Sequence, residues 1–96
     1  MLPRVGMMAT VRFTSTLIRH RAAPSLAAPG GTVGEVLATA LADDPLLKGY
    51  VLDDQGRVRK HMNIFVDGAM IADRRHLSDP VGQQSEIYVL QALSGG

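Results

Sequence analysis

The sequence predicts a two-layer α+β domain, with one main helix packed across one face of a mixed sheet. Two observations predict it. Apolar residues recur at helical spacing after Thr32, whereas residues 9–16, 62–67 and 86–91 alternate between apolar and polar positions or carry β-branched side chains. The apolar stripe of a helix and the apolar face of a sheet each need cover, so one helix on one sheet gives two layers.

Length and composition narrow the possible classes of function. The 96 residues suit one small domain, and 46% hydrophobic residues are enough for a packed core. A formal net charge of +1 argues against nucleic acid as the main partner. The absence of cysteine excludes disulfides, thiolate metal sites and a cysteine nucleophile. With no apolar run that could span a membrane and no signal-peptide pattern, we expect a cytoplasmic protein without a membrane partner.

The chain divides into three parts. We expect residues 1–8 to be a possible disordered leader, with Met1, Met7 and Met8 as alternative starts, residues 9–92 to form the domain, and residues 93–96 to be a flexible tail. The first strand, residues 9–16, turns Val11 and Phe13 inward. Residues 22–28 follow as an edge strand, because Pro24 and Pro29 disfavour a central position in the sheet. The basic residues 19–21 between the two suit a solvated loop, or a docking site for an acidic partner.

The main helix begins at Thr32, which can cap it, and Glu35 completes a capping box. Its apolar stripe consists of Val33, Val36, Leu37, Ala40 and Leu41. Proline disfavours helical geometry in the residue before it, so residues 43–45 are expected to end the helix. Leu46 and Leu47 should add a short turn, and residues 51–52 should start another extended piece.

The second half of the chain is expected to be mainly strands and turns. Residues 53–56 form a polar turn without the spacing of a calcium loop. Asp67-Gly68 predicts a tight hairpin between a strand at 62–67 and a short return strand at 69–72. Turn residues at 77–82 then precede the last strand, residues 86–91.

Internal chemistry is not expected. The three histidines have no metal-ligand spacing, so neither a metal nor a bound cofactor is predicted. Basic residues could form a patch, but acidic residues lie beside them, and a self-neutralised surface is the favoured interpretation. The basic residues concerned are Arg57, Arg59, Lys60, Arg74 and Arg75, and the acidic ones are Asp53, Asp54, Asp67 and Asp73.

The two faces of the sheet differ. Ile64, Val66, Ile87 and Val89 should point to the helix, which leaves Phe65, Tyr88 and Leu90 on the uncovered face. Large apolar residues gathered on a solvent face mark a contact surface; the alternatives are scattered surface apolarity and a face covered by a loop. Beyond the last strand, Leu93-Ser94-Gly95-Gly96 ends in two glycines, whose backbone fits a narrow channel, and in a free carboxylate.

These features together resemble the ubiquitin-like sulfur carriers of the MoaD/ThiS family, and most of all the CysO-type carriers. The resemblance runs from Ala9 to the end. The residues that carry it are Val11-Arg12-Phe13, Thr32-Val33-Gly34-Glu35-Val36-Leu37, Gly56-Arg57-Val58-Arg59, Met62-Asn63-Ile64-Phe65-Val66-Asp67-Gly68 and the terminal Gly95-Gly96. It implies a β-grasp fold.

The resemblance also implies a mechanism. An E1-like adenylyltransferase of the MoeB/ThiF type would use ATP to adenylate the Gly96 carboxylate, with Gly95 beside it. Sulfur would replace AMP to give a thiocarboxylate. The chain would then be no enzyme but a co-substrate. Phe65, Tyr88, Leu90 and Leu93 would bind the activator and a sulfur acceptor, either a MoaE-like large subunit or a cysteine-synthase-like enzyme.

Three alternatives stay open at this point. The chain could be the small subunit of molybdopterin synthase. It could be a ubiquitin-like modifier that is conjugated through Gly96. It could also be a plain interaction module with an idle tail.

Overall fold

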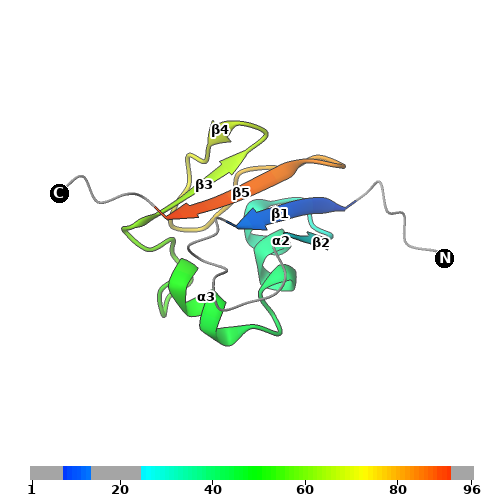
Figure 1. Ribbon diagram of the computed structural model, residues 1–96. Helices are drawn as coiled ribbons and strands as arrows, with labels where there is room; N and C mark the ends of the chain where they lie inside the picture. Colours follow the sequence, from blue (N-terminus) through cyan, green and yellow to red (C-terminus); the bar gives the residue numbers. More distant parts are fainter. Residues whose placement is uncertain (1–7, 14–24, 92–96) are drawn as a thin grey trace.

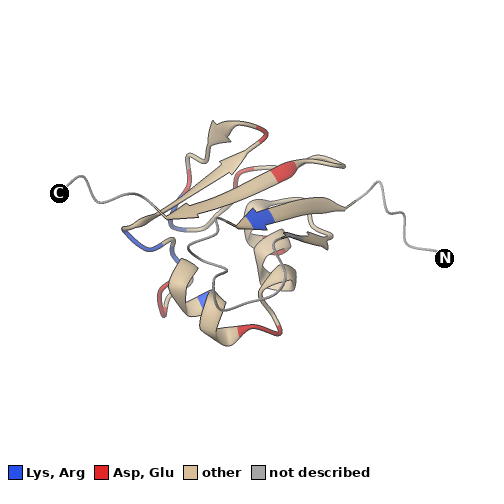
Figure 2. Ribbon diagram, in the orientation of Figure 1, with Lys and Arg blue, Asp and Glu red and all other residues tan. Residues whose placement is uncertain are grey.

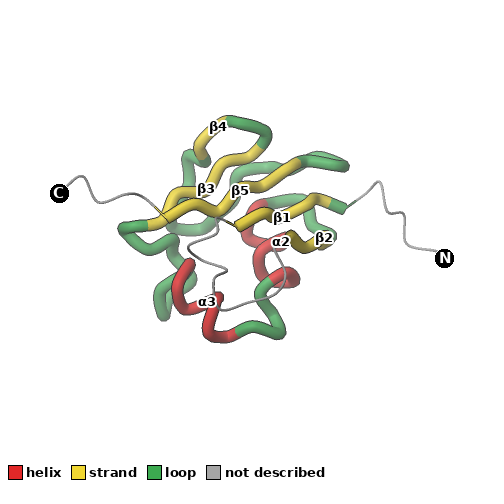
Figure 3. The backbone as a smooth tube through the Cα atoms, in the orientation of Figure 1, coloured by secondary structure: helices red, strands yellow, loops and turns green. Residues whose placement is uncertain are grey.

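The computed structural model describes residues 8–13 and 25–91, and within these ranges a five-stranded sheet carries two helices on one face (Figure 1). The elements in chain order are β1 (Ala9–Phe13), β2 (Ser25–Ala28), α2 (Val33–Ala40), α3 (Pro45–Val51), β3 (Met62–Val66), β4 (Ala69–Met70) and β5 (Glu86–Gln91). Figure 3 shows the same two layers, with the helices on one side of the strands. The predicted α+β architecture is confirmed.

The strand order is β2-β1-β5-β3-β4, so the last strand of the chain occupies the centre of the sheet. β5 lies parallel to β1 and antiparallel to β3. β2 is an edge strand, as the flanking prolines predicted. Asp67 and Gly68 both have positive φ, 49° and 90°, and they join β3 to β4 in a two-residue turn of the expected kind.

Helix α2 begins as the capping box predicted. The Thr32 Oγ1 accepts the Glu35 N–H at 3.2 Å, and the Glu35 Oε1 accepts the N–H of Gly31 at 2.7 Å. Two further backbone donors of the first turn bind the loop before β5: Val33 N–H donates to the Asp79 carbonyl at 3.0 Å, and Gly34 N–H donates to the Leu77 carbonyl at 2.9 Å. The helix is thereby fixed to the sheet at its start.

Helix α3 corrects two of the sequence predictions. A short turn was expected at Leu46 and Leu47 and an extended piece from Val51, but residues 45–51 form one helix and Val51 is its last residue. The physical reason is that Pro45 occupies the first turn, where its missing N–H costs nothing. The Asp44 Oδ1 caps the helix by accepting the Leu47 N–H at 3.1 Å. Of the two leucines, Leu47 is buried and Leu46 is exposed.

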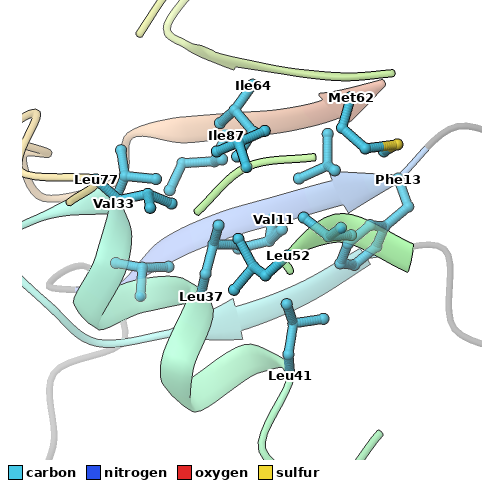
Figure 4. Close-up of a cluster of buried hydrophobic side chains, with 14 of the residues drawn as sticks. Val11, Phe13, Val33, Leu37, Leu41, Leu52, Met62, Ile64, Leu77 and Ile87 are labelled. Carbon is cyan, nitrogen blue, oxygen red and sulfur yellow. The ribbon is translucent and has the colours of Figure 1, made fainter. Parts of the chain in front are cut away.

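The hydrophobic core lies between the helices and the covered face of the sheet (Figure 4). α2 contributes Val33, Val36 and Leu37, and the strands contribute the residues that alternation predicted to point inward, except that Val66 is only half-buried. The fully buried strand residues are Val11, Ile64, Ile87 and Val89. No helix in the described part of the chain is long and apolar enough to cross a membrane.

Candidate functional site

The face of the sheet opposite the helices, called the open face below, is defined by strand register. Arg12 on β1 and Phe65 on β3 are both cross-strand partners of Tyr88, which places all three on one face. The other residues at these alternate positions are Thr10, Ser25, Ala27, Asn63, Met70, Glu86 and Leu90. The structure thus brings together Phe65, Tyr88 and Leu90, the three contact residues expected on the domain.

The apolar part of the open face centres on Tyr88, which is 38% exposed. Phe65 lies beside it on β3 and Leu90 lies two residues further along β5; both are half-buried. Met70 was missed in the sequence, although it is 53% exposed and pairs with Phe65 across the hairpin. The signal that could have found it is the tight Asp67-Gly68 turn, which fixes the register of the two strands.

A polar cluster lies at one end of the open face. The Glu86 Oε1 accepts a hydrogen bond from the Tyr88 hydroxyl at 2.9 Å and forms an ion pair with the Arg12 Nε at 3.3 Å. The Asp67 Oδ1 holds the backbone by accepting the Glu86 N–H at 2.9 Å. The hydrogen bond to Glu86 raises the pKa of Tyr88. Because an exposed pair adds little stability, the cluster acts mainly by fixing the orientation of Tyr88.

The tail leaves the sheet at the end of β5. Gln91, the last described residue, pairs with Met62 at the start of β3, directly after the turn at residues 59–61. Leu93, Gly95 and Gly96 lie outside the described residues, so their predicted roles stay predictions. β1 and β5 are parallel, so β5 ends at the end of the sheet opposite the start of β1 (Figure 1).

The charged residues near this exit differ from the favoured expectation. Asp53 forms an ion pair with Arg57 at 3.1 Å, and the hydrogen bond from the Arg57 backbone is the main cause of its lowered pKa. No carboxylate lies within ion-pair distance of Arg59, Lys60 or Arg74 among the described residues. Blue segments accordingly lie near the end of β5 in Figure 2. Arg57 thus has an ion-pair partner among the described residues, and Arg59, Lys60 and Arg74 do not.

Asp73 is engaged in its own loop. Its carboxylate accepts hydrogen bonds from the Ser78 hydroxyl at 2.5 Å and from the amides of Arg75, His76 and Ser78. The Ser78 hydroxyl is the largest cause of a pKa lowered to about 2. The loop also supplies the carbonyls that hold α2, so this carboxylate has a structural role. No group of three metal-ligating side chains occurs in the described part of the chain.

A helix-covered mixed sheet whose central strand leads into the tail is the β-grasp, ubiquitin-like fold. Among solved structures, the fold is similar to the small archaeal modifier protein 1 (SAMP1) of Methanosarcina acetivorans, with TM-score 0.78, 23% identity and coverage of 93% of this chain and 96% of that one.

Two further solved structures share this fold. A chain of the Amycolatopsis orientalis BexX/CysO complex has TM-score 0.78 and 21% identity, covering 92% of this chain and 99% of that one. Mycobacterium tuberculosis CysO, described as an antigen, has TM-score 0.75 and 22% identity, covering 88% of this chain and 99% of that one.

The sequence matches no protein-family model, and no curated protein matches it significantly. At identities below 25% the structural likeness establishes the fold. The predicted β-grasp fold is thus confirmed, and the neighbours include CysO, the type of carrier that the sequence resembles.

Proposed function

We propose that this chain is a sulfur carrier whose Gly96 carboxylate is activated by an E1-like adenylyltransferase and converted to a thiocarboxylate. The observation that carries the proposal is the combination of a β-grasp domain with a terminal Gly95-Gly96, which only residues 92–94 separate from the end of its central strand. Any partner that holds the sheet thereby controls where the chain end is presented.

The chemistry takes two steps, both in partner active sites. A carboxylate oxygen of Gly96 attacks the α-phosphorus of ATP, and pyrophosphate leaves, so that an acyl-adenylate forms. A sulfide ion supplied by the partner then attacks the carbonyl carbon, and AMP leaves, so that the thiocarboxylate forms. Activation is needed because an ionised carboxylate resists nucleophilic attack. ATP is consumed by the activator and is not a bound cofactor of this chain.

The chain itself acts as a co-substrate. It contains no cysteine, so it could carry sulfur only as an acyl species at the terminus. The open face supplies a docking surface, with Tyr88 at its centre and Phe65 and Leu90 beside it, and Leu93 would continue the contact along the tail. Tyrosine is enriched among the residues that dominate interface energies, and the hydrogen bond to Glu86 keeps this one in place.

The intact mass of the chain tests the proposal. The chain is incubated with ATP, an E1-like adenylyltransferase from the same organism and a sulfur donor. We expect an ATP-dependent increase equal to the exchange of one oxygen for one sulfur. An unchanged mass, with an activator that is competent on another carrier, rejects the proposal.

Stable co-purification with a MoaE-like large subunit would identify the acceptor as molybdopterin synthase, and retention by a cysteine-synthase-like enzyme would identify the other acceptor class.

A second function is conjugation to proteins, because fold neighbours include chains named small archaeal modifier protein 1. In that case the activated Gly96 would form an amide with a lysine of another protein. The last basic residue is Arg75, so trypsin leaves a long remnant. Cleavage after Glu86 instead leaves residues 87–96 on the modified lysine. Detection of that branched peptide in cell extract would support this second function.

A further inference from the structure

We propose that Arg59, Lys60 and Arg74 form a basic rim at the tail exit, and that this rim binds acidic side chains around the entrance of the partner site that receives the tail. The inference rests on the proposed function and deepens it, because it states the chemistry of the partner surface. The partner is a protein with an acidic border around a narrow channel.

The rim is fixed to the end of β5 by backbone contacts. The Arg74 Nη2 donates to the carbonyls of Arg59 and Met62, at 2.8 and 2.7 Å, and the Met62 N–H donates to the Arg59 carbonyl at 2.9 Å. Met62 is the cross-strand partner of Gln91. The Arg74 guanidinium therefore holds the turn closed beside the strand from which the tail departs.

The charges of the rim are not neutralised within the described residues. The ion pairs in that part of the chain join Arg12 to Glu86 and Arg57 to Asp53. Asp73, next to Arg74 in the chain, directs its carboxylate to the amides and hydroxyl of its own loop. The three cations give this end of the domain a local positive charge, although the net charge of the whole chain is only +1.

The rim also borders the open face. The Arg74 Nη1 donates to the Asn63 Oδ1 at 3.4 Å, and Asn63 is the cross-strand partner of Leu90. A partner seated on Tyr88 and Leu90 that also takes the tail therefore passes over the rim. The acidic residues Glu86 and Asp67 lie toward the opposite end of the same face, which gives the docking surface a direction.

The position of the rim decides what it contacts. Residues 92–96 span at most about 18 Å when extended, so the tail is long enough for the Gly96 carboxylate to react beyond the rim. The rim then contacts the surface around the entrance and not the nucleotide. A nucleic acid could also bind three cations, but a net charge of only +1 argues against nucleic acid as the main partner.

The test compares two substitutions that change the net charge equally. Lys60→Glu reverses a rim charge whose ammonium makes no hydrogen bond or ion pair with the described residues, so the fold should tolerate it. Lys48→Glu does the same on helix α3, on the covered side of the sheet. Thiocarboxylate formation is followed with the full chain, ATP and the E1-like adenylyltransferase, at several carrier and salt concentrations.

We expect Lys60→Glu to raise KM for the carrier about 3- to 10-fold at low salt, with kcat little changed, and Lys48→Glu to leave both unchanged. The difference should shrink as salt rises, because salt screens exposed charges. Equal KM values for the two variants would contradict the proposal that the rim binds the partner. Failure of the wild-type chain to be activated would instead overturn the proposed function, so the two failures are distinguishable.

Zero-length carbodiimide crosslinking gives an independent readout. The Lys60 amine should form an amide with an aspartate or glutamate of the adenylyltransferase, detected as a crosslinked peptide. Crosslinks from Lys48 in place of Lys60 would contradict the rim. A loss of binding to a short RNA in Lys60→Glu, with activation unchanged, would also overturn it in favour of nucleic acid.

Discussion

Ile87 and Tyr88 are neighbours on β5, but they meet different surroundings. Ile87 is fully buried under helix α2, whereas Tyr88 is 38% exposed on the open face and has its hydroxyl bound to Glu86. Successive side chains of a strand point to opposite faces, so one strand serves two purposes. The covered face holds the domain together, and the open face is the proposed docking surface. Substitutions on the two faces should therefore separate stability from partner binding.

The largest effect is expected on the covered face. Ile87→Ala removes a fully buried side chain and leaves a cavity between β5 and α2, which should lower the free energy of unfolding by about 2–5 kcal/mol. Urea denaturation followed by circular dichroism measures it. The folded fraction should still be activated with an unchanged KM. A KM defect in that fraction would show that the two faces are not independent.

The next effect concerns the start of α2. Gly30 has a φ of 151°, and a Cβ there would lie 2.8 Å from the Val36 nitrogen and 2.9 Å from the Glu35 Cβ. Gly30→Ala should therefore destabilise the domain by about 1–3 kcal/mol, as measured by urea denaturation.

The matched control is Gly49→Ala in α3. No atom lies within 4 Å of the added Cβ, so the helix should gain about 0.5–1 kcal/mol. Equal effects of the two substitutions would contradict the tight packing at Gly30.

A substitution on the open face should change partner binding more than it changes the stability of the domain. Tyr88→Ala should raise KM for activation at least about fivefold, which corresponds to about 1 kcal/mol, if Tyr88 is a central contact. The loss of its pairing with Phe65 should lower stability by less than about 1 kcal/mol. Thr39→Ala, at an exposed position of α2, is the control and should leave KM unchanged. An unaltered KM in Tyr88→Ala would remove the open face from the docking surface.

The smallest effect is expected from Asp73 and depends on pH. Its folded pKa is lowered to about 2 from 3.8, so its stabilising contribution is complete above the unfolded pKa and is lost as the pH falls through about 2. Asp73→Asn should be less stable than wild type at pH 7, and the difference should shrink at pH 2. Urea midpoints at the two pH values measure this. The exposed Asp54→Asn serves as control; a similar pH-dependent difference there would refute the assignment to Asp73.

Much of the fold was predictable because its signals are local. The alternation of residues 86–91, the Thr32–Glu35 capping box and the Asp67-Gly68 turn each state a backbone preference within a few residues. Helix α3 was not predicted, since Asp44-Pro45 is compatible with the end of one helix and with the start of the next, and Gly49 weakens the helical pattern.

The site was predictable in part. Alternation places Phe65, Tyr88 and Leu90 on one face, and the terminal glycines are visible in the sequence. The pairing of Arg12 with Glu86 joins residues that are 74 positions apart, and the contacts of Arg74 with Arg59 and Met62 arise when a loop meets the start of β3. Such contacts depend on the tertiary fold, and no local sequence pattern predicts them.

The most direct measurement of the central claim is the position of sulfur in the activated chain. After reaction with ATP, the E1-like adenylyltransferase and a sulfur donor, fragmentation mass spectrometry of the intact protein should place the oxygen-to-sulfur exchange at Gly96. A chain that lacks Gly96 should show no exchange in the same reaction. Sulfur at any other residue, or an equal exchange in the shortened chain, would contradict the account.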